Sequence, residues 1–249
     1  MTYPNYKNKH LEESLFNPGD YVSYKKWSNS RMPSKYILIY QISPLKHFKR
    51  EFRGKYEKIK LYNQHEVLVH RNIGFIRMNG IGSPHSVTFL EELIAMGGKY
   101  FISIGIAGGL QREGIFLCNK ALRDEGTSYH YVPDGDFSYP DEKLTKKLGK
   151  YIKLQGLKFS EGATWTIDAP YRETKAEIAK YKKEGISTVE MEASALFTVA
   201  KYRKVKMASA FVVSDVLGEK WDPKFHKMDV KRSLNKLIDA AITCLTNLK

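Results

Sequence analysis

Short apolar runs rich in β-branched and aromatic residues alternate with amphipathic stretches along most of this chain, and that alternation restricts its fold more than any other feature. Strands are expected at 35–42, 57–80 (two or three short ones), 99–110, 114–123, 158–167 and 206–217. Helical spacing of apolar residues predicts helices over 85–98, 141–156, 173–185, 189–204 and the C-terminal end. Strands that alternate with helices predict an α/β fold around a largely parallel sheet.

The 249 residues fit one large domain, since single α/β domains commonly reach ~200–250 residues. Residues 1–33 are polar and aromatic, which indicates an N-terminal extension with a short helix near 11–16. No linker, internal repeat or low-complexity tract interrupts the rest. Residues 34–249 are therefore predicted to form a single domain.

The chain is strongly basic, with a net charge of +14 from 41 Lys and Arg against 27 Asp and Glu. Its densest basic runs, 46–50 and 201–206, do not alternate with aromatics as nucleic-acid-binding surfaces do, so solvated helix faces explain them and nucleic acid is an unlikely partner. A positive field would still attract phosphate or a phosphorylated substrate.

Only two cysteines are present, Cys118 and Cys244, and they cannot form a disulfide framework. The first residues lack the apolar core of a signal peptide, and no apolar run approaches the ~20 residues that cross a bilayer. These features predict a soluble cytoplasmic protein without a membrane partner.

Polar clusters follow the predicted strands at the ends where α/β sheets bind ligands. They are GIGSPHS (80–86), IGIAGGL (104–110), TIDAPYRET (166–174) and VVSDVL (212–217), with VEMEAS (189–194) opening a predicted helix. Glycines such as Gly82 and Gly105 let the backbone approach a ligand, and a helix that starts after them favours an anion. Neither glycine cluster matches a dinucleotide fingerprint or a P-loop, so tight packing explains each of them equally well.

Two acidic positions are candidates for chemistry. Asp215 follows a buried strand, where partial desolvation favours a protonated carboxyl that can act as a proton donor; capping a turn is the structural alternative. Glu192 is expected near the buried side of the first helical turn, where its carboxylate can accept bonds from a vicinal diol. Met191 can pack on a sugar face, whereas helix capping and surface charge are the plain roles for Glu190 and Glu192.

Taken together, the motifs resemble the purine-nucleoside and uridine phosphorylase superfamily. The matching segments, which span the chain from about Tyr36 to the C-terminal helix, are NGIGSPHS, LEELIAMGGKYFISIGIAGGL, LRDEGTSYHYVP, VEMEASALF and VVSDVL. The resemblance implies a three-layer α/β fold with a central mixed, partly barrel-like sheet flanked by helices, assembled as dimers or as a hexamer of dimers. It also implies cleavage of the N-glycosidic bond of a nucleoside, with phosphate as the acceptor in most members and water in some.

The resemblance also implies roles for individual residues. Glu192 corresponds to the glutamate that binds the ribose hydroxyls, with Met191 beneath the sugar and Glu190 beside them. Asp215, with Ser214 next to it, corresponds to the acid that protonates a departing purine. In the loop 165–174, Tyr171 is expected to stack on the base, and Arg172 or Glu173 to contact its edge. No metal is expected, and no cofactor beyond phosphate as a co-substrate.

This chain departs from the family pattern where phosphate would bind. Ser103 and Ile106 stand where relatives have an arginine and a hydroxyl residue, and 41–50 lacks the usual glycine, so that Lys46 only loosely replaces the second arginine. Gly82, Ser103, Lys46 and Arg123 are therefore the candidate phosphate contacts, with Lys49 and Arg50 as further substitutes. Water is the alternative acceptor, although 36–47 has no acid to activate it.

A further alternative is a nucleoside-binding protein that has lost turnover. The resemblance also implies that a neighbouring subunit completes each site with a histidine near its N-terminus. His10 is the candidate for that role, and a structural role is the alternative.

Overall fold

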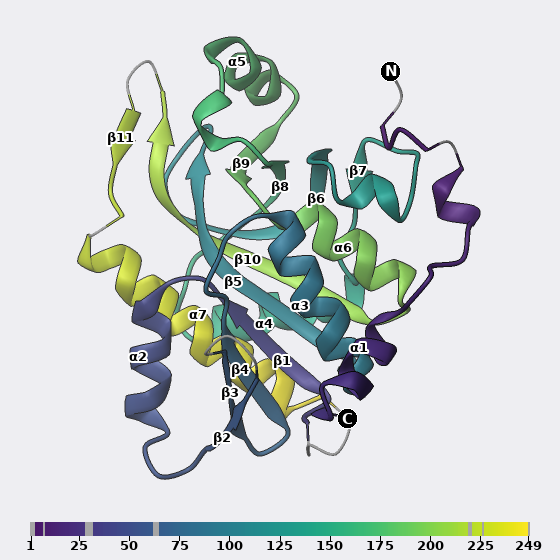
Figure 1. Cartoon of the computed structure of the whole chain (residues 1–249). Helices are drawn as coiled ribbons and strands as arrows, with labels where there is room; N and C mark the ends of the chain where they lie inside the picture. Colours follow the sequence, from purple (N-terminus) through teal and green to yellow (C-terminus); the bar gives the residue numbers. More distant parts are fainter. Residues whose placement is uncertain are drawn as a thin grey trace.

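The long strands β5 (Tyr100–Gly109) and β10 (Lys206–Leu217) run side by side through the middle of the structure (Figure 1). The computed structural model describes residues 3–6, 8–27, 32–61, 65–218, 221–225 and 227–248. Over these residues the sheet order is β11-β10-β6-β8-β9-β5-β1-β4-β3-β2, with β7 on β6. Because β10 also pairs with β5, the strands β10, β6, β8, β9 and β5 close into a ring, which makes the sheet partly barrel-like.

The remaining strands are β1 (Lys35–Ile39), β2 (Glu57–Lys60), β3 (Glu66–His70), β4 (Ile73–Arg77), β6 (Ile115–Asp124), β7 (Phe137–Ser138), β8 (Ser160–Ile167), β9 (Ile186–Glu190) and β11 (Trp221–Pro223). The helices are α1 (Pro18–Tyr24), α2 (Ile42–Glu51), α3 (Ser83–Ala95), α4 (Glu142–Leu154), α5 (Lys175–Lys183), α6 (Ala193–Tyr202) and α7 (Met228–Thr246). Parallel pairs (β1 with β4 and β5) and antiparallel pairs (β3 with β4, β5 with β9) occur together, so the sheet is mixed rather than largely parallel.

Helices cover both faces of the sheet, which gives the three layers that the family resemblance implies. Along β5 the side chains alternate: Ile102 and Ile104 pack with α2, α4 and α7, and Phe101 packs with α3 and α6. This alternation explains why the run 99–110 is apolar at almost every position, since both of its faces are buried.

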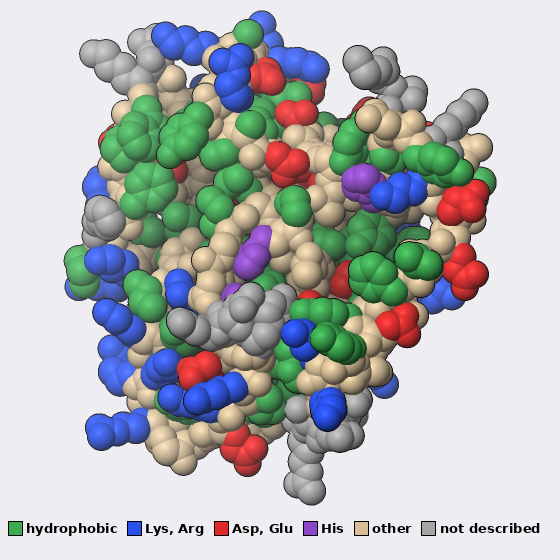
Figure 2. Space-filling model, in the orientation of Figure 1, with side chains coloured by type: hydrophobic (Ala, Val, Ile, Leu, Met, Phe, Trp, Pro, Cys, Tyr) green, Lys and Arg blue, Asp and Glu red, His purple; other side chains and the backbone are tan. Residues whose placement is uncertain are grey.

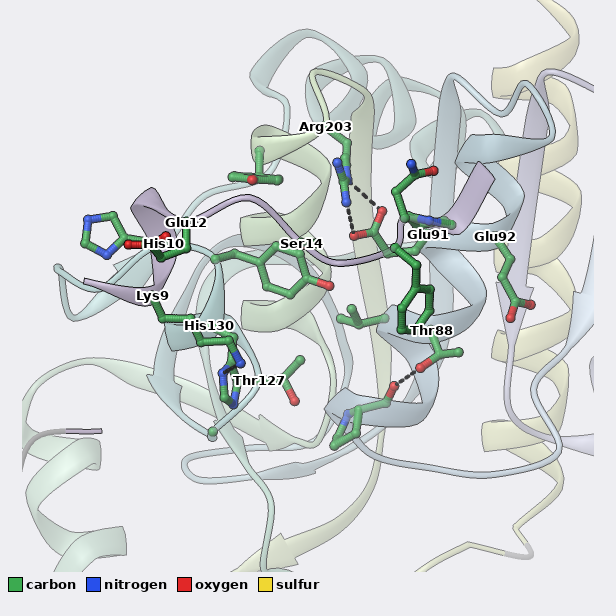
Figure 3. A pocket seen from close by; sticks show the side chains of 18 of the residues that line it. Lys9, His10, Glu12, Ser14, Thr88, Glu91, Glu92, Thr127, His130 and Arg203 are labelled. Carbon is green, nitrogen blue, oxygen red and sulfur yellow. Dashed lines mark hydrogen bonds and ion pairs between the residues drawn. The ribbon is translucent and has the colours of Figure 1, made fainter. Parts of the chain in front are cut away.

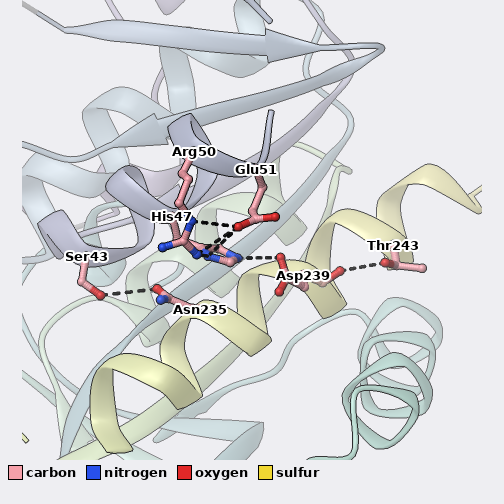
Figure 4. A network of polar contacts seen from close by, with 7 residues as sticks. All are labelled: Ser43, His47, Arg50, Glu51, Asn235, Asp239 and Thr243. Atoms are coloured by element: carbon pink, nitrogen blue, oxygen red, sulfur yellow. Dashed lines mark hydrogen bonds and ion pairs between the residues drawn. The ribbon is translucent and has the colours of Figure 1, made fainter. Parts of the chain in front are cut away.

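The basic run 46–50 lies in α2, as its interpretation as a helix face predicts, but α2 already begins at Ile42, the last residue of the strand predicted over 35–42. Pro44 fits the first turn of a helix, where its missing N–H is not needed. His47 and Phe48 are buried, and His47 Nε2 lies 2.8 Å from Asp239 Oδ1 on α7 (Figure 4). Lys46 and Arg50 are exposed, so this basic run is a solvated helix face.

Two other boundaries differ from the prediction. The run 189–204 is not helical from its start, since Val189 and Glu190 end β9 and α6 begins at Ala193. No α-helix forms over 11–16, where Leu11 ends a 3-10 turn (Lys9–Leu11); instead α1 begins at Pro18, with Asn17 and Asp20 forming a reciprocal capping box. None of the described helices combines the length and apolarity that crossing a membrane requires.

Candidate active site

A cavity of about 700 Å³ opens where β5, β9 and β10 reach their carboxyl ends. Its walls come from four segments: the glycine end of β5, the 170–175 loop, the turn after β9, and the β10–β11 hairpin. Among the described residues its lining includes Ile106, Gly108, Tyr171, Glu173, Lys175, Glu190, Met191, Ser214, Asp215, Leu217, Trp221 and Phe225. The polar clusters 104–110, 166–174, 189–194 and 212–217 thus all contribute to this cavity, whereas the cluster 80–86 does not line it.

Asp215 enters the cavity at a β-bulge. The pairing of β10 with β5 matches Val213 to Ala107 and then Asp215 to Gly108, so that Ser214 is the extra residue. Ser214 Oγ donates to Asp215 Oδ1 at 2.8 Å, and the Trp221 indole Nε1–H donates to Oδ2 at 2.9 Å. The carboxyl is buried and held at both oxygens, which fixes its direction toward the cavity.

Glu190 is the acid that stabilises the turn between β9 and α6. Its Oε2 accepts from the amides of Glu192 at 2.8 Å and Ala193 at 2.7 Å, and its Oε1 accepts from Thr166 Oγ1 at 2.6 Å. Burial, and then the charge of Glu192, raise the pKa of Glu190. Glu190 lines the cavity, but its hydrogen bonds give it the capping role that the sequence analysis left open.

We expect Glu190→Ala to lower the free energy of unfolding by about 2–5 kcal/mol, because it leaves two buried amides and a hydroxyl without an acceptor. Urea unfolding followed by circular dichroism measures the change. Glu184→Ala, at an exposed position just after α5, is the control and should change stability by less than about 0.5 kcal/mol. Equal stability of the two variants would contradict the capping role.

Glu192 lies next to the cavity residue Met191 but does not itself line the cavity. It is buried, and its Oε1 accepts from the Gly82 amide at 2.6 Å. Ser83 Oγ donates to the Met191 carbonyl at 2.8 Å, so the start of α3 is joined to this turn twice. Burial raises the pKa of Glu192, and the Gly82 hydrogen bond opposes that rise. Gly82 has φ 94°, a conformation that favours glycine.

The candidate phosphate residues do not converge. Gly82 is bonded to Glu192, and Ser103 on β5 is buried, with its Oγ 3.5 Å from the Tyr40 hydroxyl. Lys46 is exposed on α2 and is not among the lining residues. Arg123 is buried elsewhere: its Nε donates to Ser128 Oγ, and its terminal nitrogens donate to the carbonyls of Val132, Asp134 and Gly135. Sequence could not show this, because a lone arginine gives no sign of its partners.

Tyr171 and Arg172 lie on a short 3-10 helix, Pro170–Arg172, at the rim of the cavity. The Tyr171 side chain is 99% exposed, so in this structure it does not reach inward to stack on a base, and Arg172 does not line the cavity. Trp221 is also largely exposed, and Phe225 packs near it. Figure 2 shows hydrophobic side chains gathered over β11 and the nearby end of β10.

Glu173 is a second carboxyl in the same cavity. Burial, followed by the charges of Asp215 and Glu177, raises its pKa from 4.5 to about 7. Neutral and charged forms therefore coexist near neutral pH, which makes Glu173 a candidate contact for a donor or an acceptor on a base edge. The motif resemblance implies Glu173 only as an alternative to Arg172, and nothing in the sequence indicates a role for Trp221.

We expect Glu173→Gln to become more stable relative to the original chain as pH rises from about 4.5 to 7. The pKa of Glu173 is raised in the folded protein, so between pH 4.5 and 7 the acid ionises in the unfolded chain but stays largely protonated in the folded one. The original chain therefore loses stability as pH rises through this window, whereas Gln does not titrate. Thermal unfolding across this pH range measures the difference, with exposed Glu161→Gln as the control. A constant difference between variant and original chain would rule out the raised pKa.

The N-terminal segment forms a separate cavity of about 670 Å³ against α3 and α6 (Figure 3). His10 and His130 line this cavity, as do Arg203 and Glu91. The Arg203 guanidinium donates two hydrogen bonds to the Glu91 carboxylate, at 2.7 and 2.9 Å. His10 does not reach the Asp215 cavity of its own chain, and its role in a neighbouring subunit stays a prediction. Within the described ranges, no three His, Cys, Asp or Glu side chains gather so as to hold a metal ion.

Known proteins match both the sequence and the fold. A family model described as the phosphorylase superfamily matches residues 43–248. A DeoD-type purine nucleoside phosphorylase from Bacillus cereus is 28% identical over 175 residues, 67% of this chain and 74% of that protein. An AMP nucleosidase from Bacteroides thetaiotaomicron has a TM-score of 0.75 at 22% identity, covering 94% of this chain and 100% of that one. A uridine phosphorylase from Vibrio fischeri has a TM-score of 0.71 at 25% identity, covering 86% and 90%. The chain belongs to the phosphorylase superfamily of nucleoside phosphorylases and nucleosidases.

Proposed function

We propose that this protein cleaves the N-glycosidic bond of a purine nucleoside, with Asp215 as the acid that protonates the departing base. The observation that carries the proposal is the position of Asp215, whose two carboxyl oxygens each accept a hydrogen bond. Asp215 lines the same cavity as Glu190 and Met191, the residues that directly precede Glu192. An exposed or distant Asp215 would not serve this role.

The chemistry follows from where charge develops. As the C1′–N bond lengthens, the sugar approaches an oxocarbenium ion and the base becomes negative. A carboxylic acid at the base end supplies the proton, and carboxylates at the sugar end stabilise the positive charge and bind the 2′- and 3′-hydroxyls. We assign the first role to Asp215, which lines the cavity, and the second to Glu192, whose chain neighbours Glu190 and Met191 line it.

Two of the proteins named above support cleavage of a purine nucleoside or nucleotide: the phosphorylase from Bacillus cereus and the AMP nucleosidase. The acid Asp215 favours a purine base over uracil, because a purine that leaves through N9 can be protonated at N7. Phosphate as the co-substrate remains a prediction here, and hydrolysis is its alternative.

The experiment is to incubate the protein with inosine, adenosine, AMP and uridine and to follow release of the base by chromatography. Each substrate is tested with and without phosphate. Release of hypoxanthine or adenine but not uracil supports the proposal. Nucleoside binding in calorimetry without any base release would instead identify a binding protein.

Assembly of the chain into a homo-oligomer, either a dimer or a hexamer, remains a prediction, and so does its location in the cytoplasm. Light scattering after size-exclusion chromatography tests the oligomeric state, and a strictly monomeric active protein would refute it.

A further inference from the structure

The two glycine segments near the cavity are the natural places for an anion, and the first is already bonded to the chain itself. Free amides at the start of a helix bind anions. Here the Gly82 amide before α3 donates to the Glu192 carboxylate at 2.6 Å, and Ser83 Oγ donates to the Met191 carbonyl. The carboxylate of Glu192 thus takes the hydrogen bond that a phosphate oxygen would need.

The second glycine segment is covered by Tyr40. The register of β1 against β5 pairs Ile39 with Ile104, which brings the next residue, Tyr40, beside Gly105. A Cβ added at Gly105 would lie 3.4 Å from the Tyr40 ring, so the ring packs over the glycine at contact distance. The aromatic ring fills the space that Gly105 leaves open.

The Tyr40 hydroxyl forms a cluster with two serines. Ser103 Oγ on β5 donates to it at 3.5 Å, and Ser86 Oγ in the first turns of α3 lies 3.4 Å away. Burial, followed by the charge of Glu192, raises the pKa of Tyr40 far above its usual range, so its hydroxyl is neutral and can both donate and accept. Neutral hydroxyls of this kind suit a water molecule.

The carboxyls around this site do not favour a phosphate dianion. Glu190 and Glu192 are both buried here, and any negative charge that they carry repels a phosphate unless a cation balances it. Lys175 is the one cation among the described residues that line the cavity, and it belongs to the segment that carries the exposed Tyr171. Lys46 and Arg123 lie elsewhere, as described above.

We infer that water, rather than phosphate, accepts the sugar in this protein, because Tyr40 and Glu192 occupy the two glycine segments where an anion would bind. The inference rests on the proposed function. The C1′–N bond breaks with its electron pair leaving on the base, and Asp215 gives the base its proton. The oxygen of one water bonds to C1′, and the proton that this water loses returns through solvent to Asp215. The products are the free sugar and the free base.

The test follows both products of the full-length protein, with inosine or adenosine as substrate. We expect base release at the same rate with and without inorganic phosphate, a stoichiometric yield of reducing sugar, and no sugar 1-phosphate signal in ³¹P NMR. A rate that saturates with phosphate and yields sugar 1-phosphate would overturn this inference while leaving the proposed function intact. Absence of base release in both conditions would overturn the proposed function, and the inference with it.

Variants separate the ring from its hydroxyl. Tyr40→Phe keeps the ring, so cleavage should stay independent of phosphate, with kcat lower by roughly threefold to tenfold for one lost hydrogen bond. Tyr151→Phe, on α4, is the matched control and should keep the original rate, because Tyr151 packs in the α2, α4 and α7 cluster whereas Tyr40 packs in the α3 and α6 cluster. The double variant Tyr40→Ala/Ser103→Arg removes the ring and adds a guanidinium; we expect it to form sugar 1-phosphate when phosphate is present. Phosphate dependence in Tyr40→Phe would count against exclusion by the ring.

Discussion

Asp215→Asn lowers kcat for purine nucleoside cleavage by about 10²–10⁴-fold, the range expected when a general acid is lost. The amide has nearly the same shape as the carboxyl, so it can still accept from Ser214 or Trp221, but it cannot give a proton to the base. We therefore expect the change in kcat with little change in KM or in the thermal midpoint. Stopped assays of base release at neutral pH measure it.

The matched control is Asp222→Asn, in the same β10–β11 hairpin. Asp222 is exposed and forms an ion pair with Lys224 at 2.7 Å, and it does not line the cavity. Its replacement should leave kcat unchanged. A nucleoside carrying a better leaving group should restore much of the rate to Asp215→Asn, because its base needs no proton. Full activity of Asp215→Asn with inosine would remove the acid from the mechanism.

Glu192→Gln lowers kcat/KM for a ribonucleoside by about 10²–10⁴-fold, since each hydrogen bond to a charged group contributes roughly 1.5–3 kcal/mol and a diol forms two. The glutamine carbonyl can still accept from the Gly82 amide, so the loss falls mainly on the substrate rather than on the fold. Steady-state kinetics with inosine, with exposed Glu161→Gln as the control, measure the effect.

A second substrate shows whether the loss acts through the diol. With 2′,3′-dideoxyinosine the original protein already lacks both hydroxyl contacts, so Glu192→Gln should reduce its kcat/KM far less than it does for inosine. This is a double-mutant cycle in which one change is made in the substrate. Equal losses for the two nucleosides would show that Glu192 acts on the enzyme alone, through its bond to Gly82.

Much of the fold could be predicted because its elements are local patterns. The apolar run 99–110 and the amphipathic stretch 141–156 correspond to β5 and α4, since periodicity reports which side of a segment is buried. The start of α2 at Ile42 was not predicted, because the apolar run 35–42 is typical of one continuous strand. The packing of α2 on α7 through His47 and Asp239 is a tertiary contact that a local pattern does not report.

The sequence by itself determined the α/β class, the family and the candidate acids of the site, because strand ends, glycine positions and the order of motifs can be recognised in short stretches of the chain. Only the tertiary structure decided which residue each of these side chains contacts, and therefore which role it can have. In the folded chain Glu190 caps the turn before α6, and Glu192 accepts from Gly82, which lies 110 positions away. Arg123 donates to loop carbonyls, and Trp221 donates to Asp215. The tertiary structure also placed Tyr40 over Gly105. Local patterns show which face of a segment is buried, whereas a side chain's partner depends on which distant segment the sheet brings beside it, and that information lies in the strand pairing.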